Sequence, residues 1–146
     1  MIGAIVPPPS QSLMATTSSL DAEAGIVTLT FTGVTSFAEW ERAIDGILAD
    51  PRYRVGMCLL SDRREAADIM SKEYIDRVVD YLSLHGASFV GCGWALVAST
   101  PADFGMTRMA ATFAERTVVN VRAFQRMEDA VEWLRTINAS ATTPAS

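Results

Sequence analysis

Two arginines and an aspartate follow the most apolar segment of the sequence, and they are its clearest candidates for chemistry. Asp62, Arg63 and Arg64 follow the run VGMCLL at 55–60, which we expect to be a buried strand, after a single serine. Guanidinium groups form paired hydrogen bonds with carboxylates and with anionic ligands. The cluster is therefore either an ion-pair lock, which is the favoured interpretation, or a cradle that orients an anionic ligand.

A second polar segment, STPADFGMTR, supplies Thr100, Phe104 and Arg108 as further candidate ligand contacts. Thr100 is expected to cap a helix, and Arg108 is expected one turn into it. Arg108 could therefore reach an anion bound at the start of the helix. The alternative is that Arg108 pairs with Asp103 or Asp62.

Ser71 precedes a segment in which apolar residues have helical spacing, so we expect it to cap that helix. A phosphate on Ser71 would also be tolerated, because the positive end of the helix dipole stabilises a dianion. Capping alone is the favoured role, and phosphorylation of Ser71 is the alternative.

The sequence is poor in the groups that catalysis and metal binding require. Its one histidine, His85, lies at a predicted helix end, where a bond to a terminal carbonyl is favoured over catalysis. Cys58 and Cys92 lie in apolar segments and are expected to be free, buried thiols. One histidine and two cysteines are too few for a structural zinc site. We therefore expect no enzyme activity, no cofactor and no metal.

The composition is typical of one globular domain. The chain has 146 residues, of which 49% are hydrophobic, and this is enough apolar surface for a core. A net charge of −5 without a basic stripe argues against nucleic acid as a partner. No apolar run approaches the roughly 18 residues of a membrane span, and the N-terminus lacks the basic segment of a signal peptide. We therefore expect a cytoplasmic location and no integral membrane segment.

The periodicity of apolar residues predicts strands that alternate with helices. Val27, Leu29 and Phe31 alternate with threonines, which is typical of a strand with one covered face. Ser36 and Glu39 form a capping box that opens the first helix. The predicted order is a strand at 12–18, a strand around 27–31, a helix from 36 to 50, a strand at 55–60, a helix from 71 to 86, a strand at 94–99, a helix from 100, a strand at 119–123 and a last helix that contains 130–134.

This order predicts a single α/β domain with a mixed, mostly parallel five-stranded sheet and four helices. The first strand should pair antiparallel, and the apolar strands at 55–60 and 94–99 should be central. The domain is expected over 12–137, between flexible tails at 1–11 and 138–146.

Ligands of open parallel sheets bind beyond the carboxyl ends of the strands. The segments that the prediction places there are 32–36, 61–71 and 99–108. We expect them to converge on one rim of the sheet, which would hold the candidate site.

Several strings of the sequence resemble the SpoIIAA-like branch of the STAS/SEC14 superfamily. They are FTGVTSFAEWERAIDGILADPRY, GMCLLSDRR, WALVASTPADFGMTRMAATFAE and VRAFQRMEDAVEWLR, and the resemblance covers roughly residues 20 to 136. It implies an α/β domain with a mixed sheet.

The resemblance also implies two kinds of function. Anti-sigma-factor antagonists of this superfamily carry a phosphorylatable Ser or Thr at the start of the helix after a central strand, in a context like Asp-Ser-Ser-Gly. Ser71, in IMSKEY, is the nearest match, but the flanking Asp and Gly are missing, which argues against a phospho-switch. SEC14 members bind lipids in a large apolar cavity, and this chain looks too short to close one and keep its core.

We carry forward two functions. The first is a non-enzymatic binding or regulatory module that recognises a protein partner or a small anionic ligand at the rim. The alternative is a carrier of a small apolar or lipid-like ligand, suggested by the SEC14 resemblance and by the cluster Phe104, Met106, Met109 and Phe113. A homodimer is a further expectation, because exposed edge strands and symmetric dimers are common.

Overall fold

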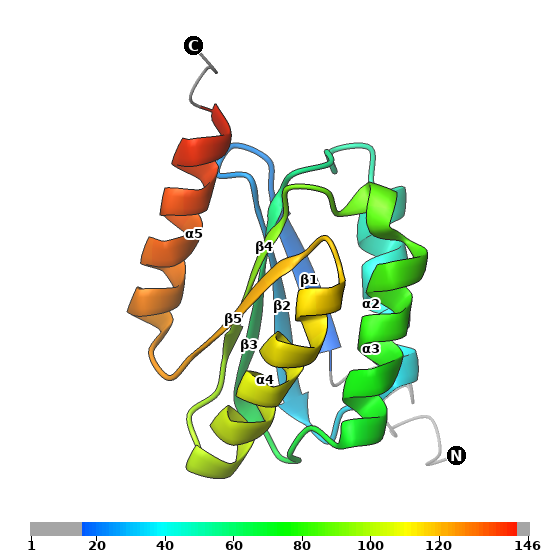
Figure 1. Ribbon diagram of the computed structural model, residues 1–146, viewed down its shortest axis with the longest axis vertical. Helices are drawn as coiled ribbons and strands as arrows, with labels where there is room; N and C mark the ends of the chain where they lie inside the picture. Colours follow the sequence, from blue (N-terminus) through cyan, green and yellow to red (C-terminus); the bar gives the residue numbers. More distant parts are fainter. Residues whose placement is uncertain (1–15, 143–146) are drawn as a thin grey trace, which may run out of the picture.

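The computed structural model describes residues 16–142, which form one five-stranded sheet with helices on both faces (Figure 1). The strands lie in the order β1-β2-β3-β4-β5. They are β1 (Thr16–Asp21), β2 (Ile26–Gly33), β3 (Cys58–Ala66), β4 (Gly93–Val97) and β5 (Asn120–Phe124). The helices are α2 (Phe37–Ala49), α3 (Lys72–Leu84), α4 (Pro101–Phe113) and α5 (Met127–Thr142), with short 3₁₀ turns η2 (Gly86–Ser88) and η3 (Ala114–Arg116).

The predicted topology is confirmed. β1 pairs antiparallel with β2, and the other neighbouring strands pair parallel. The apolar strands β3 and β4 are interior, and every residue of β4 is buried. The class is therefore α/β, with a mixed, mostly parallel sheet.

The two faces of the sheet are covered unequally. Helix α5 lies alone on one face, while α2, α3 and α4 lie on the other (Figure 1). The smaller core beneath α5 includes Leu60, Val97 and Leu134. The larger core includes Phe31, Trp40 and Trp94, and it is the one that borders the candidate site.

Local signals set the helix starts. Ser36, Ser71 and Thr100 each accept, through the side-chain hydroxyl, a hydrogen bond from the backbone N–H three residues later, at 3.2, 3.0 and 3.2 Å. Such caps satisfy amides that have no partner within the helix, and each contributes about 1 kcal/mol. The three predicted caps are therefore confirmed.

Strand β3 is longer than predicted. We expected a loop from residue 61, but the strand continues to Ala66 because β2 extends beside it, pairing Thr32 with Glu65 and Gly33 with Ala66. The pairing shifts register between Thr30 and Thr32. The backbone of residues 61–66 therefore pairs with a neighbouring strand, and the loop begins only after Ala66.

The first strand and the last helix both extend further than predicted. Helix α5 runs to Thr142, so the tail predicted at 138–146 is helical in its first part. Asn138 donates to the Ala24 carbonyl at 3.0 Å, which ties this helix to the turn between β1 and β2. Strand β1 continues to Asp21, past the predicted end at 18. Residues 1–15, with the tail predicted at 1–11, and residues 143–146 lie outside the described part.

Both cysteines are free and buried, as predicted. Burial raises the pKa of each thiol. A raised pKa keeps the thiol neutral at neutral pH, and the neutral form is a poor nucleophile. We therefore expect Cys58 and Cys92 to react with 5,5′-dithiobis(2-nitrobenzoate) at pH 7.5 at least about tenfold more slowly in the folded protein than in 6 M guanidinium chloride. Rapid reaction of the folded protein would contradict this burial.

Candidate functional site

A buried ion pair joins β3 to α4. Arg63 has a side chain that is 0% exposed, and its Nε donates to Asp103 Oδ2 at 3.0 Å and to Oδ1 at 3.4 Å. The guanidinium also lies over the Phe31 ring, 5.5 Å from its centroid. Arg63 therefore forms a buried ion pair, which is the favoured of its two predicted roles.

The same pair gathers the loops at the carboxyl ends of β2 and β3. Arg63 Nη2 donates to the Asp68 carbonyl oxygen at 3.0 Å, and the Met70 N–H donates to Asp103 Oδ1 at 3.4 Å. The Asp68 carboxylate accepts from the N–H and the hydroxyl of Thr35, at 3.2–3.3 Å. The three segments that we expected at one rim are thus brought together there.

Asp62 and Arg64 do not join this cluster. Side chains alternate along a strand, so these two project from the face opposite to Arg63. Arg64 donates to both carboxylate oxygens of Asp62 at 2.9 Å, and these hydrogen bonds lower the pKa of Asp62. The favoured ion-pair interpretation therefore also describes Asp62 and Arg64, but the three side chains form two separate pairs on opposite faces of the strand.

The α4 candidates are also separated. Thr100 serves as the helix cap, and Asp103 turns inward to Arg63. Arg108 is exposed, with its guanidinium 6.0 Å from the Phe104 ring centroid. Within residues 16–142 Arg108 forms no ion pair, so the alternative in which it pairs with Asp103 or Asp62 is wrong.

Ser71 and His85 occupy the two ends of α3. The Ser71 hydroxyl accepts from the Tyr74 N–H, and this residue is exposed. The His85 ring lies against the Tyr81 ring, with centroids 4.1 Å apart. Tyr81 donates its hydroxyl proton to Asp45 at 2.5 Å, and its pKa is raised by burial and by this hydrogen bond. Phosphorylation of Ser71 stays a prediction.

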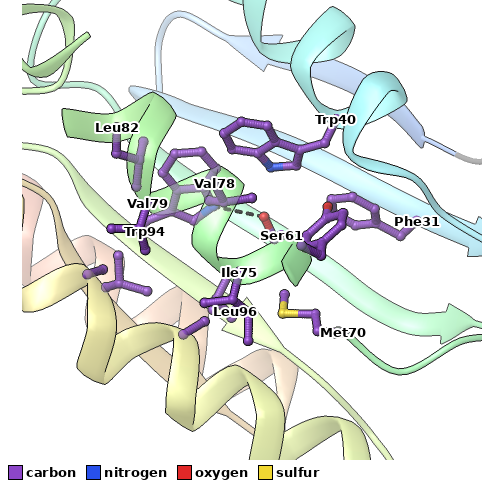
Figure 2. Close-up of a pocket in the computed structure, with 14 residues that line it drawn as sticks. Phe31, Trp40, Ser61, Met70, Ile75, Val78, Val79, Leu82, Trp94 and Leu96 are labelled. Carbon is purple, nitrogen blue, oxygen red and sulfur yellow. Dashed lines mark hydrogen bonds between the residues drawn. The ribbon is translucent and has the colours of Figure 1, made fainter. Parts of the chain in front are cut away.

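An apolar cavity of about 40 Å³ lies between α3 and the sheet. Figure 2 shows Phe31 and Met70 at one end of it and Leu82 at the other. Helix α3 contributes the longest wall, while Trp40 comes from α2 and Trp94 from β4. The lining residues are Phe31, Trp40, Ser61, Met70, Tyr74, Ile75, Val78, Val79, Leu82, Trp94, Leu96, Ala110, Ala114 and Val121.

Ser61 is the one aliphatic hydroxyl in this lining. It is 2% exposed, and its oxygen accepts a hydrogen bond from Trp94 Nε1 at 2.8 Å (Figure 2). Trp94 in turn stacks on Trp40, with ring centroids 5.9 Å apart. The cavity therefore has a rigid aromatic wall with one fixed hydroxyl.

Replacing Ser61 by alanine leaves the buried Trp94 N–H without its acceptor. We expect a loss of about 1–3 kcal/mol in the free energy of unfolding, measured by urea denaturation. Ser99→Ala is the matched control, since Ser99 is exposed and donates only to the Arg64 carbonyl at 3.3 Å. Equal effects of the two changes would contradict a structural role of the Ser61 hydroxyl.

The apolar cluster that suggested a carrier is not the wall of this cavity. Phe104, Met106, Met109 and Phe113 are absent from the lining, to which α4 contributes Ala110. The apolar stripe of α3, which includes Ile75, could be predicted from its helical spacing, whereas the role of Ser61, directly after the apolar run at 55–60, was missed.

Residues 16–142 show neither a metal cluster nor a membrane span. No three His, Cys, Asp or Glu side chains of this part lie together as metal ligands. None of its helices combines the length and the apolar character needed to cross a bilayer.

The five-stranded mixed sheet with its four helices has a SpoIIAA-like α/β fold, as a structural match shows. The structure resembles the crystal structure of an uncharacterized protein of the DUF3478 family from Shewanella loihica PV-4, which has a SpoIIAA-like fold. The TM-score is 0.55 with 18% sequence identity, over 82% of this chain and 92% of the other. Comparison of the sequence with protein-family models and with curated proteins finds no match.

Proposed function

We propose that this chain is a non-enzymatic binding module that takes up a small apolar molecule between α3 and the sheet. The observation that carries the proposal is the unfilled apolar space beneath α3, lined by two stacked tryptophans. Protein interiors are normally close-packed, so an apolar void loses dispersion contacts that a ligand would restore. Ligand sites of this kind are mostly apolar with few polar groups.

The ligand must enlarge the cavity. A cavity that holds benzene measures about 150 Å³, which exceeds the 40 Å³ present here. Helix α3 packs between α2 and α4, so an outward shift of α3 would widen the space along its whole length. Met70 closes one end, and its unbranched side chain can change rotamer at small cost (Figure 2). We propose that α3 and Met70 move together on binding.

The rim has less support as a site for an anionic ligand or a protein partner. Arg63 and Arg64 already have carboxylate partners, so an anionic ligand there would be repelled by negative charge that is already in place. Arg108 is separated from both, on the exposed side of α4. The apolar cavity is therefore the site that the geometry favours.

The test is a titration with hexane, a probe without polar groups. Trp40 and Trp94 lie in the cavity wall, whereas Trp133 packs on Phe124 at the opposite face of the sheet. In a Trp133→Phe background, the emission of the two cavity tryptophans should therefore report binding directly. We expect a saturable change in emission, with matching uptake of hexane measured by headspace gas chromatography. Absence of uptake by the folded protein would overturn the proposed function.

A further inference from the structure

One polar group beside the cavity is a buried hydrogen-bond donor without an acceptor. Arg63 Nη1 is buried and has no hydrogen-bond partner among the described residues. The Ser61 oxygen already accepts from Trp94, and within residues 16–142 no acceptor receives its own proton. A buried donor without a partner costs about as much as a lost hydrogen bond, so Arg63 Nη1 marks a place for an acceptor.

Arg63 lies behind the Phe31 end of the cavity, next to its lining residues and not among them. It follows Ser61 by two positions on β3, so both side chains project from the same face of the sheet. Its guanidinium covers the ring of Phe31, which is a wall of the cavity. Its partner Asp103 accepts from the backbone of Met70, which closes the same end.

The charges around Arg63 select a neutral acceptor. The guanidinium carries one positive charge, while Asp103 Oδ2 lies 3.0 Å and Asp68 Oδ1 3.8 Å from its nitrogens. A ligand carboxylate would add a third negative charge to this group, and burial makes such repulsion strong. A carbonyl oxygen satisfies the donor without adding charge.

We infer that the ligand is a small apolar molecule with a neutral carbonyl oxygen, such as a ketone or ester, held by Arg63 Nη1 and the Ser61 hydroxyl. This inference rests on the proposed function, because it uses the same cavity. An alcohol fits less well, since it brings a further donor into a site that already has donors in excess of acceptors. A carboxylate fits worst, for the reason of charge.

The experiment compares hexane, 2-hexanone, 2-hexanol and hexanoate on the Trp133→Phe protein at pH 7.5. We expect 2-hexanone to bind about tenfold more tightly than 2-hexanol, because the alcohol buries an unpaired donor. Hexanoate should bind more weakly than either. Arg63 is kept intact in this series, so the comparison does not depend on a variant that fails to fold.

The outcomes separate the inference from the function on which it rests. If no probe binds, the proposed function fails and the inference with it. If hexane binds while the ketone and the alcohol bind equally, the cavity is a binding site and the carbonyl preference is wrong. Tightest binding of hexanoate would overturn the neutral-acceptor inference and make Arg63 an anion receptor.

Discussion

Replacing Arg63 by methionine should lower the free energy of unfolding by about 3–5 kcal/mol. The change keeps an apolar side chain on β3 but leaves Asp103 buried without its cation. Breaking a buried pair from one side is costly because the remaining charge has lost both water and its partner. Urea denaturation followed by circular dichroism measures the effect.

Arg64→Met is the matched control. Arg64 is the next residue on β3, and its pair with Asp62 is partly exposed. Exposed pairs contribute about 0–1 kcal/mol, so this variant should be close to wild type. If Arg63→Met were as mild as Arg64→Met, the Arg63–Asp103 pair would not be a structural lock.

A double variant separates charge from packing. In Arg63→Met with Asp103→Leu, neither buried charge remains, and replacing both partners of a buried pair by apolar residues is often neutral. We expect it to be more stable than Arg63→Met alone. The Met70 N–H donates to Asp103 Oδ1 at 3.4 Å and loses this partner in the double variant. The free energy of unfolding should therefore recover only in part.

The second large effect is expected on ligand binding, from Ala110→Val. Ala110 lines the cavity from α4, and two added methyl groups would occupy space that the ligand needs. We expect uptake of 2-hexanone to weaken at least about tenfold, while the free energy of unfolding changes by less than about 1.5 kcal/mol, since each newly buried methyl group gives back up to about 0.8 kcal/mol.

Ala111→Val is the control for this substitution. Ala111 is the next residue on α4, and it lines a surface groove beside Arg108 and Arg122 instead of the cavity. The Ala111→Val protein should bind 2-hexanone with the affinity of the wild type. Equal weakening by both variants would place the bound molecule somewhere other than beneath α3.

Local sequence signals were sufficient for the helix starts and the topology. Ser36 and Thr100 are good caps whatever surrounds them, because each needs only its own following turn. The all-apolar character of β4 indicated an interior strand for the same reason. These features depend on residues that are close in the sequence.

The site depends on contacts that are distant in the sequence. The end of β3 is set by pairing with β2, and Arg63 meets Asp103 across 40 positions of the chain. Strand alternation alone would have separated Arg63 from Asp62, but only if the strand had been predicted to extend past residue 60. The cavity is space that side chains leave unfilled, and the residue types of α3 do not reveal it.

A crystal structure of the protein soaked with 2-hexanone tests the central claim most directly. We predict electron density for 2-hexanone between α3 and β4, beside Trp94, with the ketone oxygen directed to Ser61 and Arg63. Met70 should adopt a new rotamer. Density confined to the molecular surface, or an unchanged empty cavity at a saturating ligand concentration, would contradict the account.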